Sequence, residues 1–513
     1  MSLSRLPREL RDIIYDYCTS ENGGYCFDPM GRKLRTLSGD KIDLSLTYTC
    51  KSIAAEMRGV PFRNNTIHFT TSPSPDRYTQ NYRHFGHLLE RYYLIKIFTL
   101  SRTGPFITDD IARKIIESFP HSANLIQHLR TTKATDRRLD GRMDRYLEWG
   151  FNPFSHHDAI AELLSMIARN PAFGKAIRED LFQVGYEFCD GQDASTLYSL
   201  HPKPWCIPNA HEIQTMVQHI LSCRYPSAPN RVRDQTRYYV SAASQASEFL
   251  SNLPRQIRSS IRHLELHELH ASFTYPECHA RALIPFAIEN PKLNIIRRVS
   301  LWNNVLASYR LNDSEWYRYI YSERRASIGD MDVKAVTITL APWLTEVLAP
   351  GSAGMPPKTF SLVFEGKKDS MQPIFDILVE DASWQDALEL WPGRHIVPNG
   401  RWRPTSYKGF ASYCFKELPE LMRDIIYGTG PITFDHCSGR DWNAQNILTM
   451  NSNCQSMEDW DMKWFSWRYR KFAPSLPHTW HTMLEKYVCE DEEARSSKAS
   501  DIPSLVVAFI NTV

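Results

Sequence analysis

Sequence motifs of the well-known enzyme classes are missing from this 513-residue chain. It has no phosphate-binding G-x-x-x-x-G-K-[ST] loop, no G-x-G-x-x-G turn and no G-x-S-x-G elbow. H-E-x-x-H and C-x-x-C are absent as well. We therefore expect a non-catalytic protein that needs no cofactor, with an enzyme of unrecognised site as an alternative, since many active sites have no local signature.

Long apolar runs and an excess of charge are also missing. The run "LVVAFI" (505–510) is far too short to span a bilayer, and "MSLSRLPREL" has no apolar segment of the secretory type. Sixty basic and fifty-eight acidic residues leave a net charge of +2, which disfavours a dedicated nucleic-acid binder. Eleven scattered cysteines indicate reduced thiols. We expect an intracellular protein, cytoplasmic or nuclear, without a membrane partner.

The chain has the composition of a folded protein, with 42% hydrophobic and 23% charged residues. Apolar residues at helical spacing predict helices within 155–171, 241–254 and 371–391. Alternation of apolar and polar residues predicts strands within 64–71, 261–269, 296–302 and 358–366. The fold class expected is α+β and mainly helical, with a small N-terminal helical unit and a larger helix-rich body containing a few short strands. A Ser- and Pro-rich stretch at 72–76 and a Gly- and Pro-rich stretch at 349–358 predict three units, 1–71, 77–348 and 359–513.

The N-terminal stretch "LPRELRDIIYDYC" (6–18) predicts an amphipathic helix. Leu10, Ile13, Ile14 and Tyr17 recur at i, i+3, i+4 and i+7, and Pro7 suits the first helical turn. A second helix is predicted in "IDLSLTYTCKSIAAEMRG", ended by Gly59 and Pro61. About 25 residues separate the two helical patterns.

These stretches, followed by "RNNTIHF", resemble the F-box-like N-terminal segment of large families of fungal proteins. The segment "IRHLELHELHASFTYPECHARALIPFAIENPKLNIIRRVSLW" looks like one that accompanies this N-terminus in such proteins. The resemblance covers about 70 residues closely and about 40 more loosely. The matching positions are Leu6, Pro7, Glu9, Leu10, Arg11, Ile14 and Tyr15, then Thr49, Cys50, Lys51 and Glu56.

The resemblance implies a protein-interaction module that binds a Skp-family adaptor of a cullin–RING ubiquitin ligase, while the rest of the chain selects an unknown protein substrate. The partner-binding residues expected on the first helix are Pro7, Leu10, Ile13, Ile14 and Tyr17. The long connection between the two helices departs from the ordinary F-box. The alternative is a structural or regulatory interaction protein whose first helix packs into its own core.

A second stretch, "LPELMRDIIYG" (418–428), repeats the first pattern. It shares seven of ten aligned positions with residues 6–15, but Gly428 ends the helix early and nothing corresponds to Tyr17. We expect a core helix there, with a diverged repeat of the N-terminal unit as the alternative.

Two further clusters of residues suggest chemistry. His263, His267, His270, Cys278 and His279 are natural zinc ligands, but strand residues four apart lie about 13 Å from one another, so the sequence predicts no metal site there. "WFSWRYRKF" (464–472) interleaves aromatic and basic residues, as single-stranded nucleic-acid sites do. Buried aromatics with cation–π partners at the rim are the more common arrangement, and we expect that one.

Overall fold

The fold is described from a computed structural model of the whole chain. The described ranges are 3–73, 102–131, 157–183, 200–220, 239–272, 275–308, 331–392, 417–471 and 476–487, together with separate positions in 85–100 and at 186–187, 198, 222–223 and 237. Most of the stretch at 72–76 lies outside these residues, and so does "EDEEARSSKASD" (490–501), whose acidic composition predicts a loop.

Seven strands of the described chain form one sheet in the order β11-β10-β9-β8-β3-β1-β2. From β3 to β11 the strands follow one another across the sheet in chain order and all pair in parallel. Only the hairpin of β1 and β2 is antiparallel. The strands are β1 (Tyr25–Asp28), β2 (Lys33–Thr36), β3 (Thr66–Thr70), β8 (His263–Glu268), β9 (Asn294–Ser300), β10 (Phe360–Glu365) and β11 (Ile432–Phe434).

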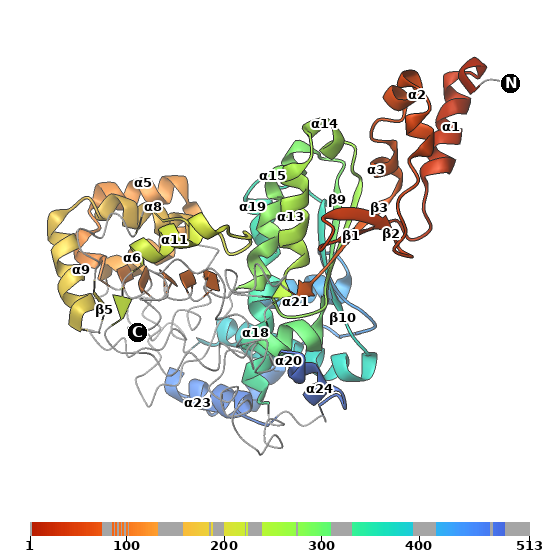
Figure 1. The fold of residues 1–513 in the computed structure, drawn as a ribbon. Coiled ribbons are helices and arrows are strands. Elements are labelled where there is room, and N and C mark those ends of the chain that lie inside the picture. The colour runs from red at the N-terminus through yellow and green to blue at the C-terminus, as the bar shows by residue number, and fades with distance from the viewer. Residues whose placement is uncertain are drawn as a thin grey trace.

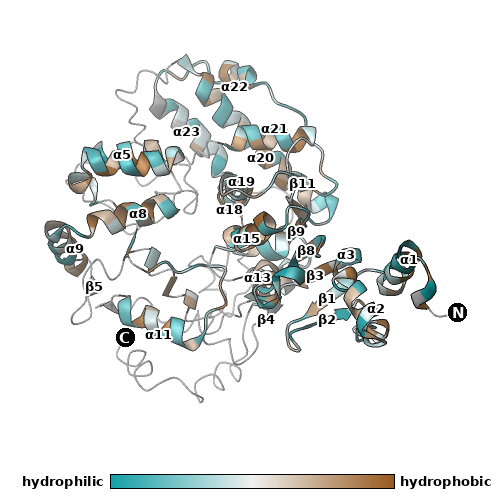
Figure 2. Cartoon of the chain, turned by 90° about the horizontal axis from the view of Figure 1, so that it is seen from above, coloured by the Kyte–Doolittle hydropathy of each residue, from teal (hydrophilic) through white to brown (hydrophobic). Residues whose placement is uncertain are grey.

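Helices cover one face of this sheet. Parallel neighbours need a crossover connection, and here the crossovers contain helices that lie on the same side of the row of strands (Figure 2). Their apolar side chains and the inward side chains of the strands form the largest hydrophobic core. The helices are α13 (Ala242–Asn252), α14 (Arg255–Arg258), α15 (Ile284–Glu289), α18 (Val333–Glu346), α19 (Leu348–Ser352), α20 (Lys368–Leu390) and α21 (Leu418–Tyr427).

A helical region with its own core is inserted between β3 and α13. It lies at the side of the molecule away from the N-terminal helices (Figure 1). Its helices are α5 (Asp109–Ser118), α6 (Ala123–Thr131), α8 (His157–Ile167), α9 (Pro171–Gln183) and α11 (Ala210–His219). Short strand pairs accompany it, β4 (Ser72–Pro73) with β7 (Tyr239–Val240) and β5 (Tyr186–Glu187) with β6 (Ser222–Cys223).

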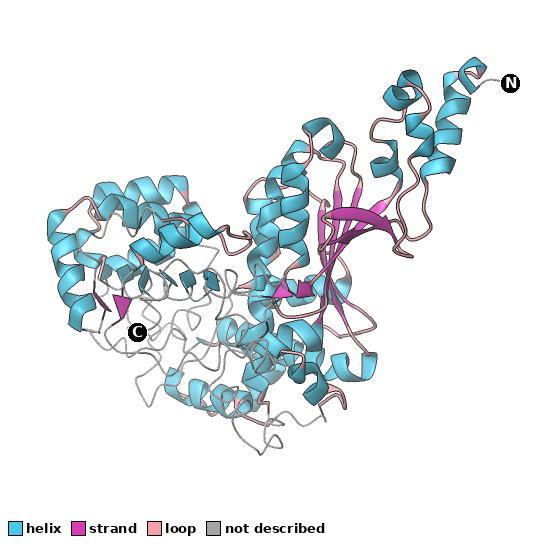
Figure 3. Cartoon of the chain, in the orientation of Figure 1, coloured by secondary structure: helices cyan, strands magenta, loops and turns pink. Residues whose placement is uncertain are grey.

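The N-terminal helices stand beyond the β1–β2 edge of the sheet, as Figure 3 shows. They are α1 (Arg8–Thr19), α2 (Lys51–Glu56) and α3 (Val60–Asn64). At the C-terminal end, α22 (Ala444–Met450) and α23 (Met457–Arg468) form a tryptophan-rich cluster with α20, and α24 (Trp480–Glu485) packs on the main core.

The mainly helical α+β class expected from the sequence is confirmed, and so are the main elements. The predicted strands within 64–71, 261–269, 296–302 and 358–366 are β3, β8, β9 and β10, although Leu301 and Trp302 belong to the following helical turn. The predicted helices are α8, α13 and α20. The three predicted units 1–71, 77–348 and 359–513 stay a prediction, and each contributes strands to the main sheet.

Two boundaries differ from the sequence prediction. Pro61 was expected to end the second helix, but it lies in the first turn of α3, where a missing N–H costs nothing. The helix α2 ends earlier, and Gly59 supplies the left-handed turn between the two, with φ of 79°. The first residues of the loop predicted at 349–358 belong to α19, because Val347, between α18 and α19, keeps a right-handed helical backbone conformation. Among the described residues, no helix is long and apolar enough to cross a membrane.

Candidate functional site

The helix α1 is fastened to α2 by one carboxylate. Arg11 donates to both oxygens of Glu56, at 2.9 and 2.7 Å, and the Tyr15 hydroxyl donates to the same carboxylate at 2.8 Å. These charge-assisted bonds lower the pKa of Glu56 to about 2, with the Arg11 bonds as the largest cause and the Tyr15 bond next. Tyr15 is fully buried against Met57 and Val60.

The predicted partner-binding stripe of α1 points the other way. At about 100° per residue, Leu10, Ile13 and Tyr17 lie on the helix side opposite Tyr15. Their side chains are 48%, 64% and 86% exposed, Pro7 is exposed, and Ile14 is partly covered. The amphipathic stripe therefore faces solvent, while the inner face of α1 uses Arg11, Tyr15 and Thr19.

The long connection between α1 and α2 does not separate these helices. Its residues form the β1–β2 hairpin, and β1 extends the main sheet by pairing in parallel with β3. Asn65, just before β3, ties the end of α1 to this edge, because its amide donates to the Thr19 carbonyl at 2.7 Å and accepts from the Glu21 N–H at 2.8 Å. The insertion thus joins the N-terminal helices to the sheet.

The helix α21, which repeats the α1 sequence, is a core helix as expected. Leu418, Leu421 and Met422 are buried in the main core, and Gly428 ends the helix in a left-handed conformation. Met422 aligns with the exposed Leu10, and the exposed Tyr427 aligns with the buried Tyr15. The two similar sequences therefore bury opposite faces.

The second candidate surface is the face of the sheet opposite the helices. Along β8, β9 and β10 the side chains alternate between fully buried on the helix side and partly exposed on this open face. At the centre of the open face Arg298 forms ion pairs with Glu265 and with Glu365, the latter at 3.0 Å. The open face is therefore polar in the middle and lies across several parallel strands.

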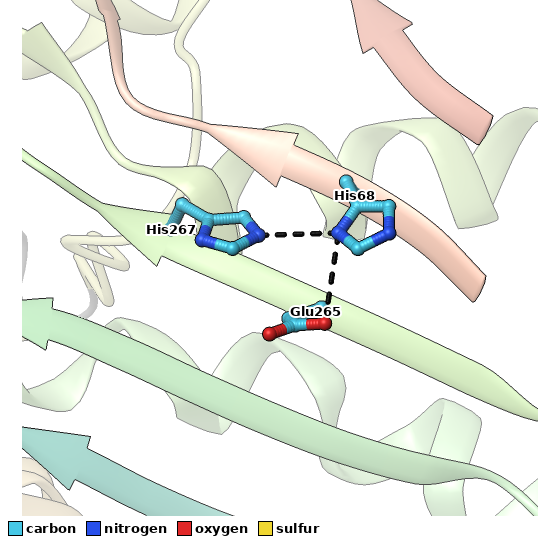
Figure 4. Close-up of side chains that lie close together, drawn as sticks. All are labelled: His68, Glu265 and His267. Atoms are coloured by element: carbon cyan, nitrogen blue, oxygen red, sulfur yellow. Dashed lines mark hydrogen bonds and ion pairs between the residues drawn. The ribbon is translucent and has the colours of Figure 1, made fainter. Parts of the chain in front are cut away.

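Beside this charged row, His68, Glu265 and His267 form a compact group (Figure 4). His68 on β3 is directly opposite Glu265 on β8, and His267 is two residues further along β8 on the same face. The His68 Nδ1 atom lies 3.1 Å from His267 Nε2 and 3.6 Å from a Glu265 carboxylate oxygen. Burial lowers the pKa of His267, which favours its neutral form.

Only one of the five histidines and cysteines considered from the sequence belongs to this group. His263 is exposed and lies four residues before His267 on the same strand, and His270 stacks on Tyr239 with ring centroids 4.4 Å apart. Cys278 is buried in the core of the helical insertion, while His279 Nδ1 lies 2.8 Å from the Ser241 hydroxyl. His68 was missed because its partners are about 200 residues away in the chain.

The tryptophans of the aromatic and basic segment are part of the core, as expected, whereas Tyr469, Arg470 and Lys471 are exposed. Trp464 and Trp467 are buried in the tryptophan-rich cluster. The Arg468 guanidinium lies 4.0 Å from the Trp464 ring centroid and pairs with the buried Asp381. These tryptophan faces are therefore covered and do not offer a platform for stacking bases.

A buried ion pair on the helix side of the sheet was not foreseen from the sequence. Arg297 and Glu268 are both buried and lie 3.1 Å apart, and the Glu268 carboxylate also accepts from the Ala242 and Ala243 N–H groups. It thereby satisfies unpaired donors at the N-terminus of α13. The sequence held one signal that could have revealed this pair. Glu268 and Arg297 each occupy a position on the apolar side of a predicted strand.

Comparison of the chain with protein-family models, with curated proteins and with solved structures finds no match in any of the three.

Proposed function

We propose that this chain is a non-catalytic receptor that joins a protein substrate to a cullin–RING ubiquitin ligase, with α1 as the helix that binds a Skp-family adaptor. The observation that carries the proposal is the outward stripe of α1, where Leu10, Ile13 and Tyr17 remain exposed although the helix is firmly attached on its other side. Contiguous exposed apolar side chains mark surfaces that bind other proteins.

The attachment of α1 supports the same proposal. A docking helix presents a defined surface only if its own orientation is fixed before binding. Glu56 fixes α1 through Arg11 and Tyr15, and the hairpin β1–β2 connects this unit to the main sheet. An adaptor bound to α1 would therefore be held at a set position relative to the open face of the sheet.

The open face is where we place the substrate protein. It extends over β3, β8, β9 and β10 and carries both signs of charge, with Glu265, Arg298 and Glu365 in one row. Mixed charges favour a partner with a complementary pattern and disfavour others. The cytoplasm or nucleus, where such ligases act, is part of this proposal.

Capture of a purified Skp-family adaptor tests the docking helix. Full-length protein should capture the adaptor, and Leu10→Asp combined with Ile13→Asp should abolish capture. Burying each aliphatic side chain contributes about 1.5–3 kcal/mol, so losing two should weaken binding about 100-fold or more.

The matched control is Met30→Asp combined with Met450→Asp, which adds the same charge at two side chains that are each 79% exposed and lie outside α1. The control should capture the adaptor like the unaltered protein. If the unaltered protein captures none, or if the α1 variant captures as well as the control, the ligase proposal is wrong. Absence of any capture would favour a structural or regulatory interaction protein, for which the same exposed stripe is the supporting observation.

A further inference from the structure

We propose that His68, Glu265 and His267 bind one divalent transition-metal ion of the zinc class on the open face of the sheet. Zinc takes imidazole nitrogen and carboxylate oxygen ligands at about 2.0–2.2 Å in a tetrahedral arrangement, which places two ligand atoms about 3.3–3.5 Å apart. The two measured separations from His68 Nδ1, 3.1 Å to His267 and 3.6 Å to Glu265, fall on either side of this spacing. All three ligand atoms lie within 4.8 Å of one another.

The scaffold of the site is rigid. Its ligands come from two strands, β3 and β8, that pair along five residues in the middle of the sheet. Neighbouring strands lie about 4.7–4.9 Å apart, so His68 and Glu265, which are register partners on the same face, meet without any change in the backbone. The three side chains are partly buried, which limits their rotamers and the competition from water.

The neighbouring charges are arranged to orient the carboxylate. Arg298 binds one oxygen of Glu265, and the other oxygen is the one that faces His68. Arg298 is itself shared with Glu365, so the local carboxylates outnumber the guanidinium by one. Partners of this kind, which hold a ligand in place without touching the metal, commonly change metal affinity by about 10–100-fold.

Three protein ligands leave one position of a tetrahedral ion unfilled. This is the arrangement of zinc sites that bind a further molecule, whereas closed structural sites use four protein ligands. The remaining position lies on the open face and can take water or a donor atom of a bound molecule. The inference rests on the strand geometry and not on adaptor binding by α1, so each can fail without the other.

Metal binding by tag-free full-length protein tests this inference. Each protein is dialysed to equilibrium against Zn²⁺, and its bound zinc is measured by elemental analysis. We expect the unaltered protein to bind about one more zinc ion per chain than the His68→Gln variant or the His267→Gln variant. His263→Gln is the matched control, because it removes an exposed imidazole from the same strand and face. It should bind like the unaltered protein. Arg298→Gln should bind about 10–100-fold more weakly if Arg298 positions Glu265.

Cobalt substitution provides a second measurement that does not depend on variants. Co²⁺ bound by two imidazoles and a carboxylate should give visible bands of a tetrahedral ion without the near-ultraviolet charge-transfer bands of thiolates. Such thiolate bands would place the metal on exposed cysteines such as Cys18 or Cys50 and overturn the inference. Equal zinc binding by the unaltered protein and the two histidine variants would overturn it as well.

Discussion

Glu56 holds the middle of α1 against α2, and Asn65 holds its end. The Glu56 carboxylate accepts from Arg11 and Tyr15, and both bonds are formed only in the folded protein. A carboxyl whose pKa is lowered on folding contributes stability above its unfolded pKa and loses that contribution as the pH falls through the folded value. For Glu56 this interval lies between about 4.5 and about 2.

The packing of α1 on α2 should therefore weaken in acid. As the pH falls from about 4.5 towards 2, the protection factors of the α1 amides, which correct the exchange rate for its intrinsic pH dependence, should fall, because a protonated Glu56 accepts poorly from Arg11. Glu56→Gln should show low protection at neutral pH and little further change in this interval. Equal protection of α1 in both proteins at pH 7 would contradict the role given to Glu56.

At the scale of single residues, the sequence indicated a group of functional side chains only where all its members lie close together in the chain. The alternation of β8 placed His263 and His267 on one face, but it could not supply His68, which comes from a distant strand. The pairing of Arg297 with Glu268 likewise depends on the register of β8 and β9. Which side chains become partners across strands can be told only when the order and the register of the strands are known.

At the scale of elements, α1 and α21 show that one pattern can be buried in two ways. Both helices contain the Arg-Asp-Ile-Ile-Tyr run, and their amphipathic patterns predict helices correctly. The pattern does not determine which face of the helix packs against the rest of the chain. In α21 the core of the sheet covers Met422, whereas in α1 the small unit around Tyr15 leaves Leu10 exposed.

Alanine substitutions at this aligned position should separate the two helices. Met422→Ala removes a fully buried side chain and should lower the free energy of unfolding by about 2–5 kcal/mol. Leu10→Ala, at a half-exposed position, should lower it by less than about 1 kcal/mol. Urea denaturation followed by circular dichroism measures both. A loss for Leu10→Ala as large as that for Met422→Ala would show that the α1 stripe is packed in the protein.

At the scale of the whole molecule, the parallel sheet connects segments that are far apart in the chain. β3 lies beside β8 although the entire helical insertion separates them in sequence. Removal of the first 76 residues would take away β1 to β4 and leave β8 as an unpaired edge, with its backbone groups open to other chains.

A chain of residues 77–513 should consequently aggregate or lose cooperative melting. The matched control is a chain starting at Glu21, which loses α1 but keeps the β1, β2 and β3 strands. Size-exclusion chromatography and thermal melting should show the control as a single folded species. A monomeric 77–513 chain with the melting temperature of the full protein would mean that residues 1–71 are a separate domain.

The sequence by itself determined several of the elements of this protein, because helices and strands follow from apolar spacing and from breakers within about 10–20 residues. It determined the amphipathic stripe of α1, the main strands and the core character of the tryptophan-rich segment. The tertiary structure decided the strand order, which face of α1 is exposed, and the meeting of His68 with Glu265 and His267. These features depend on contacts between distant segments, and a local pattern holds no information on which segments become neighbours.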